Sequence, residues 1–285
     1  MERLGTIRAR IDSAAQLQDV VAAMRSLAAL RMQQAAEIRG GARRYADIVA
    51  AALKQALLLA GDGPSAPPLR PRRALLVFSA EHGFVGGYAE AVTEAARAAA
   101  PAVMLAVGNR GAQSLIDAGQ SLDWVLPMAS HAGGLPDVAR RIADELASRL
   151  AADEFTHLDV IHGQVEDGAR WRIVRQALFP PDLGRFRNGS VADDPPIHHL
   201  PAPELLARIV EEHVLADLVL AATESLAAEN AARLEAMTAA GDNIQRKLDD
   251  LGNQERILRQ EQITEELLDV INGAELLFGT SARRP

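Results

Sequence analysis

Proline is confined to the middle of this chain, and that distribution constrains the fold more than any other feature of the sequence. Of the fourteen prolines, thirteen lie between Pro64 and Pro203, and the last is Pro285. A proline inside a helix removes a backbone hydrogen bond and clashes with the preceding turn, which costs about 3 kcal/mol. The two proline-free ends, residues 1–63 and 204–284, are rich in Ala, Leu, Glu, Arg and Gln. They are therefore predicted to form two very long helices on either side of an ordinary domain.

Both ends carry the apolar periodicity of packed helices. In the first segment, apolar residues recur at steps of three and four, as on one face of a helix. The predicted face comprises Leu4, Ile7, Ile11, Ala14, Leu17, Val20, Met24 and Leu27, and continues through Leu30, Ala35, Ile38 and Ile48. The last segment has a sustained seven-residue repeat, which is typical of a coiled coil. Its members are Leu234, Met237, Gly241, Ile244, Leu248, Leu251, Glu255, Leu258 and Gln262.

Three members of that repeat are unusual for a seam between helices. Gly241, Glu255 and Gln262 are small or polar and would weaken a seam chosen only for stability. Such positions either specify register and leave room for a neighbour, or are tolerated defects. Both interpretations are open at the level of sequence.

The charge distribution favours pairing of the two ends. Residues 1–63 hold nine basic and six acidic side chains, whereas residues 204–285 hold eight basic and sixteen acidic ones. A basic helix facing an acidic one is favourable, although each exposed ion pair contributes under about 1 kcal/mol. We expect the two helices to form an antiparallel coiled coil. The net charge of −8 argues against a nucleic-acid-binding protein.

The middle of the chain has a different pattern. Four apolar blocks are typical of buried strands in a parallel sheet, and helical stretches alternate with them. The predicted strands are residues 74–78, 103–107, 122–126 and 158–161, with a further one at 171–174, and the predicted helices are 88–99, 111–118 and 135–150. This alternation indicates an α/β domain with a Rossmann-like layered sheet. The predicted division is residues 1–63, 64–203 and 204–285.

The residues that could carry chemistry are sparse. The chain has no cysteine, which excludes disulfides and cysteine nucleophiles. Residues 81–87 follow the first predicted strand, where doubly wound folds place a phosphate-binding loop, but their glycines do not fit the dinucleotide fingerprint. The only lysines, Lys54 and Lys247, lie in the terminal helices, so no Walker loop is possible there. We interpret the glycines as serving a tight turn and close packing. His162, beside Asp159, is interpreted as a satisfied polar contact. No catalytic residue, cofactor or metal is predicted, and no apolar run is long enough to cross a bilayer.

The two ends resemble a known family. The string IRARIDS at residues 7–13, with Ala23-Met24 and Leu27 following, resembles the opening helix of the gamma subunit of F-type ATP synthases. The string RLEAM at residues 233–237 and the run RQEQITEELLDVINGAE at residues 259–275 resemble the closing helix of that family. The α/β middle also matches, so the resemblance covers the whole chain. Glu265 stands where glutamine is usual, and residues 17–21 and 255–259 are closer to the alternate, N-type branch.

The resemblance implies a function. The chain would be the central rotor shaft that couples ion flow to ATP synthesis or hydrolysis, and would not itself be catalytic. Its partners would be the alpha and beta subunits of the catalytic ring, the epsilon subunit and the membrane c-ring, on the cytoplasmic face of a bacterial inner membrane, with no direct membrane insertion. The partner-contact residues implied by the resemblance are Met24, Arg25, Arg233, Arg259, Gln260 and Thr264. The alternatives are a coiled-coil scaffolding protein with an α/β body, or an α/β enzyme that binds a nucleotide or small substrate.

Overall fold

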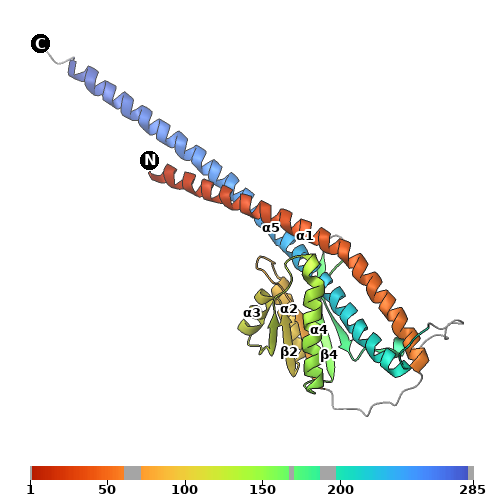
Figure 1. Ribbon diagram of the computed structural model, residues 1–285. Helices are drawn as coiled ribbons and strands as arrows, with labels where there is room; N and C mark the ends of the chain where they lie inside the picture. Colours follow the sequence, from red (N-terminus) through yellow and green to blue (C-terminus); the bar gives the residue numbers. More distant parts are fainter. Residues whose placement is uncertain (1, 61–71, 167–169, 187–196, 282–285) are drawn as a thin grey trace. The chain divides into compact units, whose positions relative to one another are not determined.

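Two long helices accompany a five-stranded sheet in the computed structural model, which describes residues 2–60, 72–166, 170–186 and 197–281 (Figure 1). Helix α1 is Glu2–Ala60 and helix α5 is Ala202–Ser281, with 59 and 80 residues. Pro203 lies in the first turn of α5, where a proline needs no backbone donor. Two long continuous helices were predicted and are confirmed. The predicted stop at residues 61–64 lies outside the described residues.

The sheet is mixed rather than wholly parallel. Its strands lie in the order β3-β2-β1-β4-β5, and only the last pair is antiparallel. The four strands predicted to form a parallel sheet are confirmed as parallel, and the further strand, whose direction was not predicted, is the antiparallel one. Residues 166–170 connect the last two strands, and this connection is too short for the crossover that parallel strands need. The strands are β1 Arg73–Phe78, β2 Val103–Val107, β3 Trp124–Leu126, β4 His157–Val165 and β5 Trp171–Phe179.

Helices cover both faces of this sheet. One core lies against α2 (Tyr88–Ala99) and α3 (Asn109–Asp117), and the other lies against α4 (Leu135–Ala151) and part of α5. Successive residues of β1 enter opposite cores, because side chains alternate along a strand. Leu75 and Val77 belong to the first core and Leu76 and Phe78 to the second. The α/β middle is therefore confirmed.

Helix α5 contributes to both cores, and its residues 221–233 are all buried. Close approach to β4 depends on a glycine. A Cβ added at Gly163 would lie 2.6 Å from Ala228 Cβ and 2.7 Å from the Tyr88 ring, so any larger residue would force a shift. The burial of a whole helical segment fixes this part of α5 firmly to the sheet.

Contacts divide the chain into two compact units. The sheet unit is residues 26–236, and the coil unit is residues 1–25 together with 237–285. Each long helix passes through both units. Residues 26–60 of α1 and 202–236 of α5 belong to the sheet unit. The predicted division into three segments stays a prediction.

The buried face of α1 differs from the prediction. One series of its buried positions is a seven-residue repeat of small residues: Val21, Ala28, Ala35, Ala42, Val49 and Ala56. Ala46, Leu53 and Leu57 are buried beside this series. Several larger residues assigned to the face are instead exposed, namely Leu17, Val20, Leu27, Leu30, Ile38 and Ile48, with 39% to 69% of their surface accessible. The prediction assigned the larger apolar side chains to the buried face. Small side chains at the contact instead let helices approach closely, so the larger ones point outward.

Candidate functional site

The helices of the coil unit pair in antiparallel fashion, as predicted. Arg8 Nε donates to Glu255 Oε1 over 2.9 Å, and Gln18 Nε2 donates to Gln245 Oε1 over 2.7 Å. From the first pair to the second, the residue number rises along α1 and falls along α5, so the two helices run antiparallel. Polar side chains thus hold the register at two positions ten residues apart on α1.

Glu255 is the central group of this pairing. Its Oε1 atom also accepts a hydrogen bond from Arg259 Nη2 at 2.6 Å. The bond from Arg8 is the main cause that lowers the pKa of the Glu255 carboxyl, and the bond from Arg259 adds to it. This contact supports the interpretation of Glu255 as a residue that specifies register. A Cβ at Gly241 would lie 3.9 Å from Val21 Cγ1, an ordinary contact, so that glycine is a tolerated position rather than a required one.

Five of the six predicted partner-contact residues lie in the coil unit. Arg25, Arg259, Gln260 and Thr264 are exposed, and Met24 is half-buried. The Thr264 hydroxyl donates to the Gln260 carbonyl oxygen at 2.9 Å. Gln260 and Thr264 therefore lie on one helical face, with the Gln260 side chain in solvent.

Helix α5 continues past the start of α1. In the register set by the two cross-helix bonds, Glu2 lies opposite Glu261. The next turns carry exposed apolar side chains, among them Ile263, Leu267 and Val270. Their neighbours Leu268 and Ile271 are exposed too, and all five have 51% to 68% of their surface accessible. A single helix with so much exposed apolar surface is suited to a protein partner.

Arg233, the sixth predicted contact residue, lies in the interior of the sheet unit. Its side chain is 7% exposed and forms an ion pair with Glu229, whose side chain is 4% exposed. Arg233 Nη1 donates to Asn230 Oδ1 at 2.9 Å, and the guanidinium reaches the carbonyl oxygens of His82 and Gly83 at 3.4 Å. Arg233 therefore connects α5 to the loop after β1.

Two carboxylates complete this connection. Glu229 Oε2 accepts from the Glu81 backbone N–H at 3.1 Å. The Glu81 carboxylate accepts from the backbone N–H groups of Asn109 at 3.0 Å and Met128 at 2.8 Å, and from Asn109 Nδ2 at 2.8 Å. Asn109 follows β2 and Met128 follows β3, so Glu81 ties together the carboxyl ends of three strands. We call this set, from Arg233 and Glu229 to Glu81, the loop clamp.

The loop clamp bears on the nucleotide hypothesis. A phosphate at this edge of the sheet would meet the carboxylates of Glu81 and Glu229 rather than free N–H groups. Gly108 has a φ of +108°, and a Cβ there would lie 2.4 Å from the Ser79 carbonyl oxygen. The glycine thus serves close backbone packing, as was interpreted for the neighbouring loop.

Sequence reasoning missed one exposed residue of the clamped loop. Phe84 has 68% of its surface accessible and a φ of +62°, a region that bulky residues rarely adopt. The preceding carbonyls of His82 and Gly83 are those that Arg233 contacts. An aromatic held outward by a strained backbone is a candidate contact residue. The only sequence signal was a phenylalanine within a glycine-rich loop.

A second polar cluster, centred on the buried carboxylate of Glu224, joins β4, α1 and α5. Glu224 accepts from Arg43 Nη2 at 3.2 Å and from Gln164 Nε2 at 3.0 Å, and its carboxylate lies 3.8 Å from His162 Nδ1. Burial lowers the pKa of the His162 ring, against the opposing effects of the Gly163 carbonyl and Glu224. His162 is thus enclosed in a polar contact, although its partners are not the predicted neighbour Asp159.

In the parts of the chain that the structure describes, no group of three or more His, Asp or Glu side chains is placed to hold a metal ion. None of the described helices is both long and apolar enough to cross a bilayer.

Comparison with known proteins agrees with this architecture. The family model described as ATP synthase matches residues 3–277. The chain belongs to this family. It is 26% identical to the ATP synthase gamma chain of Bdellovibrio bacteriovorus, over 98% of this chain and the whole of that one. It is 28% identical to the gamma chain of Paracoccus denitrificans, over 97% of this chain and the whole of the relative. The predicted resemblance is thereby confirmed, whereas the placement in the N-type branch stays a prediction.

Solved structures show the same fold. A chain from the cryo-EM structure of the Euglena gracilis mitochondrial ATP synthase, OSCP/F1/c-ring, matches with a TM-score of 0.66 at 12% identity, covering 100% of this chain and 97% of that one. A chain from the rotor of the same enzyme matches with a TM-score of 0.63 at 12% identity, covering 92% and 99%. At these identities the likeness concerns the fold. It spans the long helices as well as the sheet.

Proposed function

We propose that this chain is the gamma subunit of an F-type ATP synthase, the central shaft that couples ion flow through a membrane rotor to ATP synthesis or hydrolysis. The observation that carries the proposal is the full-length match to gamma chains. The paired helices are consistent with it, because a shaft must resist bending and twisting. The clamped sheet unit provides a rigid body to which other rotor subunits can bind.

The proposed partners are the alpha and beta subunits of a catalytic ring, the epsilon subunit and the membrane c-ring. The catalytic sites would lie in the ring, and this chain would contribute no catalytic residue. The complex would lie on the cytoplasmic face of a bacterial inner membrane, with this chain attached through its partners.

The proposed contact with the beta subunits lies on the coil unit. Gln260 and Thr264 share an exposed face, and Arg259, Arg25 and Met24 are also accessible to a partner. Neutral hydrogen bonds contribute about 0.5–1.5 kcal/mol each, so they can break and form again as the shaft turns. A buried ion pair is far costlier to separate and would hold the shaft in place.

Arg233 has a different proposed role. Its burial and its bonds to the loop after β1 support a function inside the chain. In this proposal the loop clamp transmits force between α5 and the sheet, and it holds Phe84 outward as an additional contact residue. The resemblance alone did not distinguish these roles.

The test is reconstitution with the alpha and beta subunits from the same source. The wild-type chain is expected to co-purify with the ring, and the double variant Gln260→Ala/Thr264→Ala is expected to lower assembly or ATPase activity several-fold while leaving the fold intact. The matched control is Gln113→Ala/Gln120→Ala in the sheet unit, which should behave as wild type. A wild-type chain that never binds the ring would refute the shaft function and favour the scaffold. Normal assembly and turnover of the test variant would remove only these two residues from the contact.

A further inference from the structure

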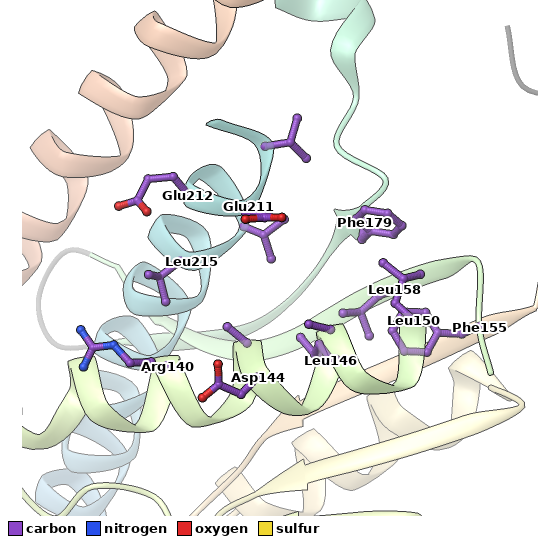
Figure 2. A pocket seen from close by; sticks show the side chains of 14 residues that line it. Arg140, Asp144, Leu146, Leu150, Phe155, Leu158, Phe179, Glu211, Glu212 and Leu215 are labelled. Atoms are coloured by element: carbon purple, nitrogen blue, oxygen red, sulfur yellow. The ribbon is translucent and has the colours of Figure 1, made fainter. Parts of the chain in front are cut away.

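Two adjoining cavities lie within the sheet unit, outside the loop clamp. The first has a volume of about 340 Å³ and lies between α4 and the first turns of α5 (Figure 2). The second has a volume of about 460 Å³ and is lined by α1, α4 and α5. Arg140 and Leu215 line both cavities, so the two lie next to each other. We call the combined depression the helix trough.

Helix α4 provides one wall along the whole trough. The wall residues repeat at steps of four and three and so share one helical face: Pro136, Arg140, Ala143, Ala147 and Leu150. These residues span fourteen positions, or about 21 Å at 1.5 Å per residue. The trough is therefore as long as four turns of a helix. The adjacent face of α4 is already buried in the sheet core through Leu135, Ala139 and Ile142.

One end of the trough is apolar. Phe155 and Leu158 form a floor that is nearly inaccessible to solvent, and Phe179 and Leu150 border it. Figure 2 shows these side chains together on one side of the cavity, away from the charged groups. An apolar opening of this size in the body of a protein is suited to large apolar side chains of a partner.

The rim of the trough is acidic. Asp144 on α4 and Glu211 and Glu212 on α5 line the first cavity together with one cation, Arg140. Arg140 lies 3.4 Å from the carboxylate of Asp137, so its charge is already compensated. Glu211 in turn lies 3.4 Å from Arg208 Nη1. With these two ion pairs set aside, Asp144 and Glu212 leave the rim an excess of negative charge beside the apolar floor.

We propose that the helix trough binds an amphipathic helix of a partner protein, with apolar residues three or four positions apart on one face and basic residues at its edge. The length of the trough fits a helix of about four turns, and helices commonly bind to grooves through such spaced anchors. The acidic rim selects basic flanks and opposes anionic ligands. A second copy of this chain is disfavoured, because its net charge is −8. The inference does not depend on the shaft function.

The test uses two fluorescent fifteen-residue peptides with the same leucine periodicity, one with lysines and one with glutamates at the remaining positions. Binding to the full chain is measured by fluorescence anisotropy. Ala147→Trp obstructs the trough at an exposed position, and Asp144→Lys/Glu211→Lys reverses part of the rim. The matched control, Glu90→Lys/Glu94→Lys, makes the same charge change on α2, which packs on the other face of the sheet.

The lysine peptide is expected to bind the wild-type chain at least about tenfold more tightly than the glutamate peptide. Each trough variant should weaken its binding about tenfold, and the control should change it less than twofold. Equal weakening by the control would show non-specific attraction and overturn the proposal. Unchanged binding to both trough variants would overturn it as well. A dimer of the wild-type chain in sedimentation velocity that Ala147→Trp abolishes would assign the trough to a second copy instead.

Discussion

Replacing Arg233 with methionine tests the loop clamp, because methionine keeps much of the length of the side chain and removes its charge and donors. The Arg233–Glu229 pair is almost fully buried. Removing one member of a buried pair costs about 3–5 kcal/mol, since the remaining charge has no compensation. In this chain Glu229 would keep only its bond from the Glu81 N–H, and the carbonyls of His82 and Gly83 would lose their donor.

Urea unfolding followed by tryptophan fluorescence measures this effect. Both tryptophans, Trp124 and Trp171, lie in the sheet unit, so their signal reports that unit. With an m value of about 2–3 kcal/mol/M, the Arg233→Met midpoint is expected to fall by about 1–2 M. Adding Glu229→Gln should recover part of the loss, because the uncompensated carboxylate is then gone. The control Arg141→Met, at an exposed position of α4, should stay within about 0.5 kcal/mol of wild type. If Arg233→Met also stays within that range, the clamp does not fix the loop.

Two further outcomes follow from the structure. The pKa of Glu255 is lowered by Arg8 and Arg259, so its ion pairs stabilise the coil above the unfolded-state pKa of about 4.3 and this stabilisation is lost as the pH falls through the lower folded-state pKa. At about pH 6 the melting temperature of Glu255→Gln, followed by circular dichroism, should therefore lie below that of the wild-type chain, and at about pH 2 the two melting temperatures should be equal. An equal difference at both pH values would contradict this. In the sheet unit, Gly163→Ala should destabilise by about 1–3 kcal/mol through overpacking, whereas Gly40→Ala, with open space around it in α1, should stabilise by up to about 1 kcal/mol. Tryptophan fluorescence in urea distinguishes them, and two shifts of the same sign would show that the packing argument fails.

Much of the fold could be predicted because its signals are local. The absence of proline and the change of hydrophobic period depend only on neighbouring residues, and they predicted both long helices and the bounds of α2 and β2. The antiparallel direction of the edge strand follows from the shortness of one connection. The hydrophobic pattern of the strands alone does not contain that information. The alanine seam of α1 was missed for a related reason. Ala28 is buried and Leu27 is exposed because of where the neighbouring elements pack against α1. The apolar pattern of one helix does not show where those neighbours lie.

The candidate site could be predicted less completely. The contact between Gln260 and Thr264 follows from their spacing on one helix. The loop clamp joins Glu81 to Glu229 across 148 residues of sequence, and only the folded chain brings them together. Phe84 and the helix trough likewise require the tertiary structure. Family resemblance identified Arg233 as important, and its burial supports the different role proposed here.

The most direct test of the shaft function is to observe rotation. The chain has no cysteine, so Ser121→Cys, at an exposed position of the sheet unit, gives a unique attachment point for a microscopic probe. The chain is assembled with its alpha and beta subunits, the ring is fixed to a surface, and the probe is followed by light microscopy as ATP is added. The account predicts continuous turning of the probe in one direction that requires ATP. A complex that hydrolyses ATP while the attached probe stays still would contradict it.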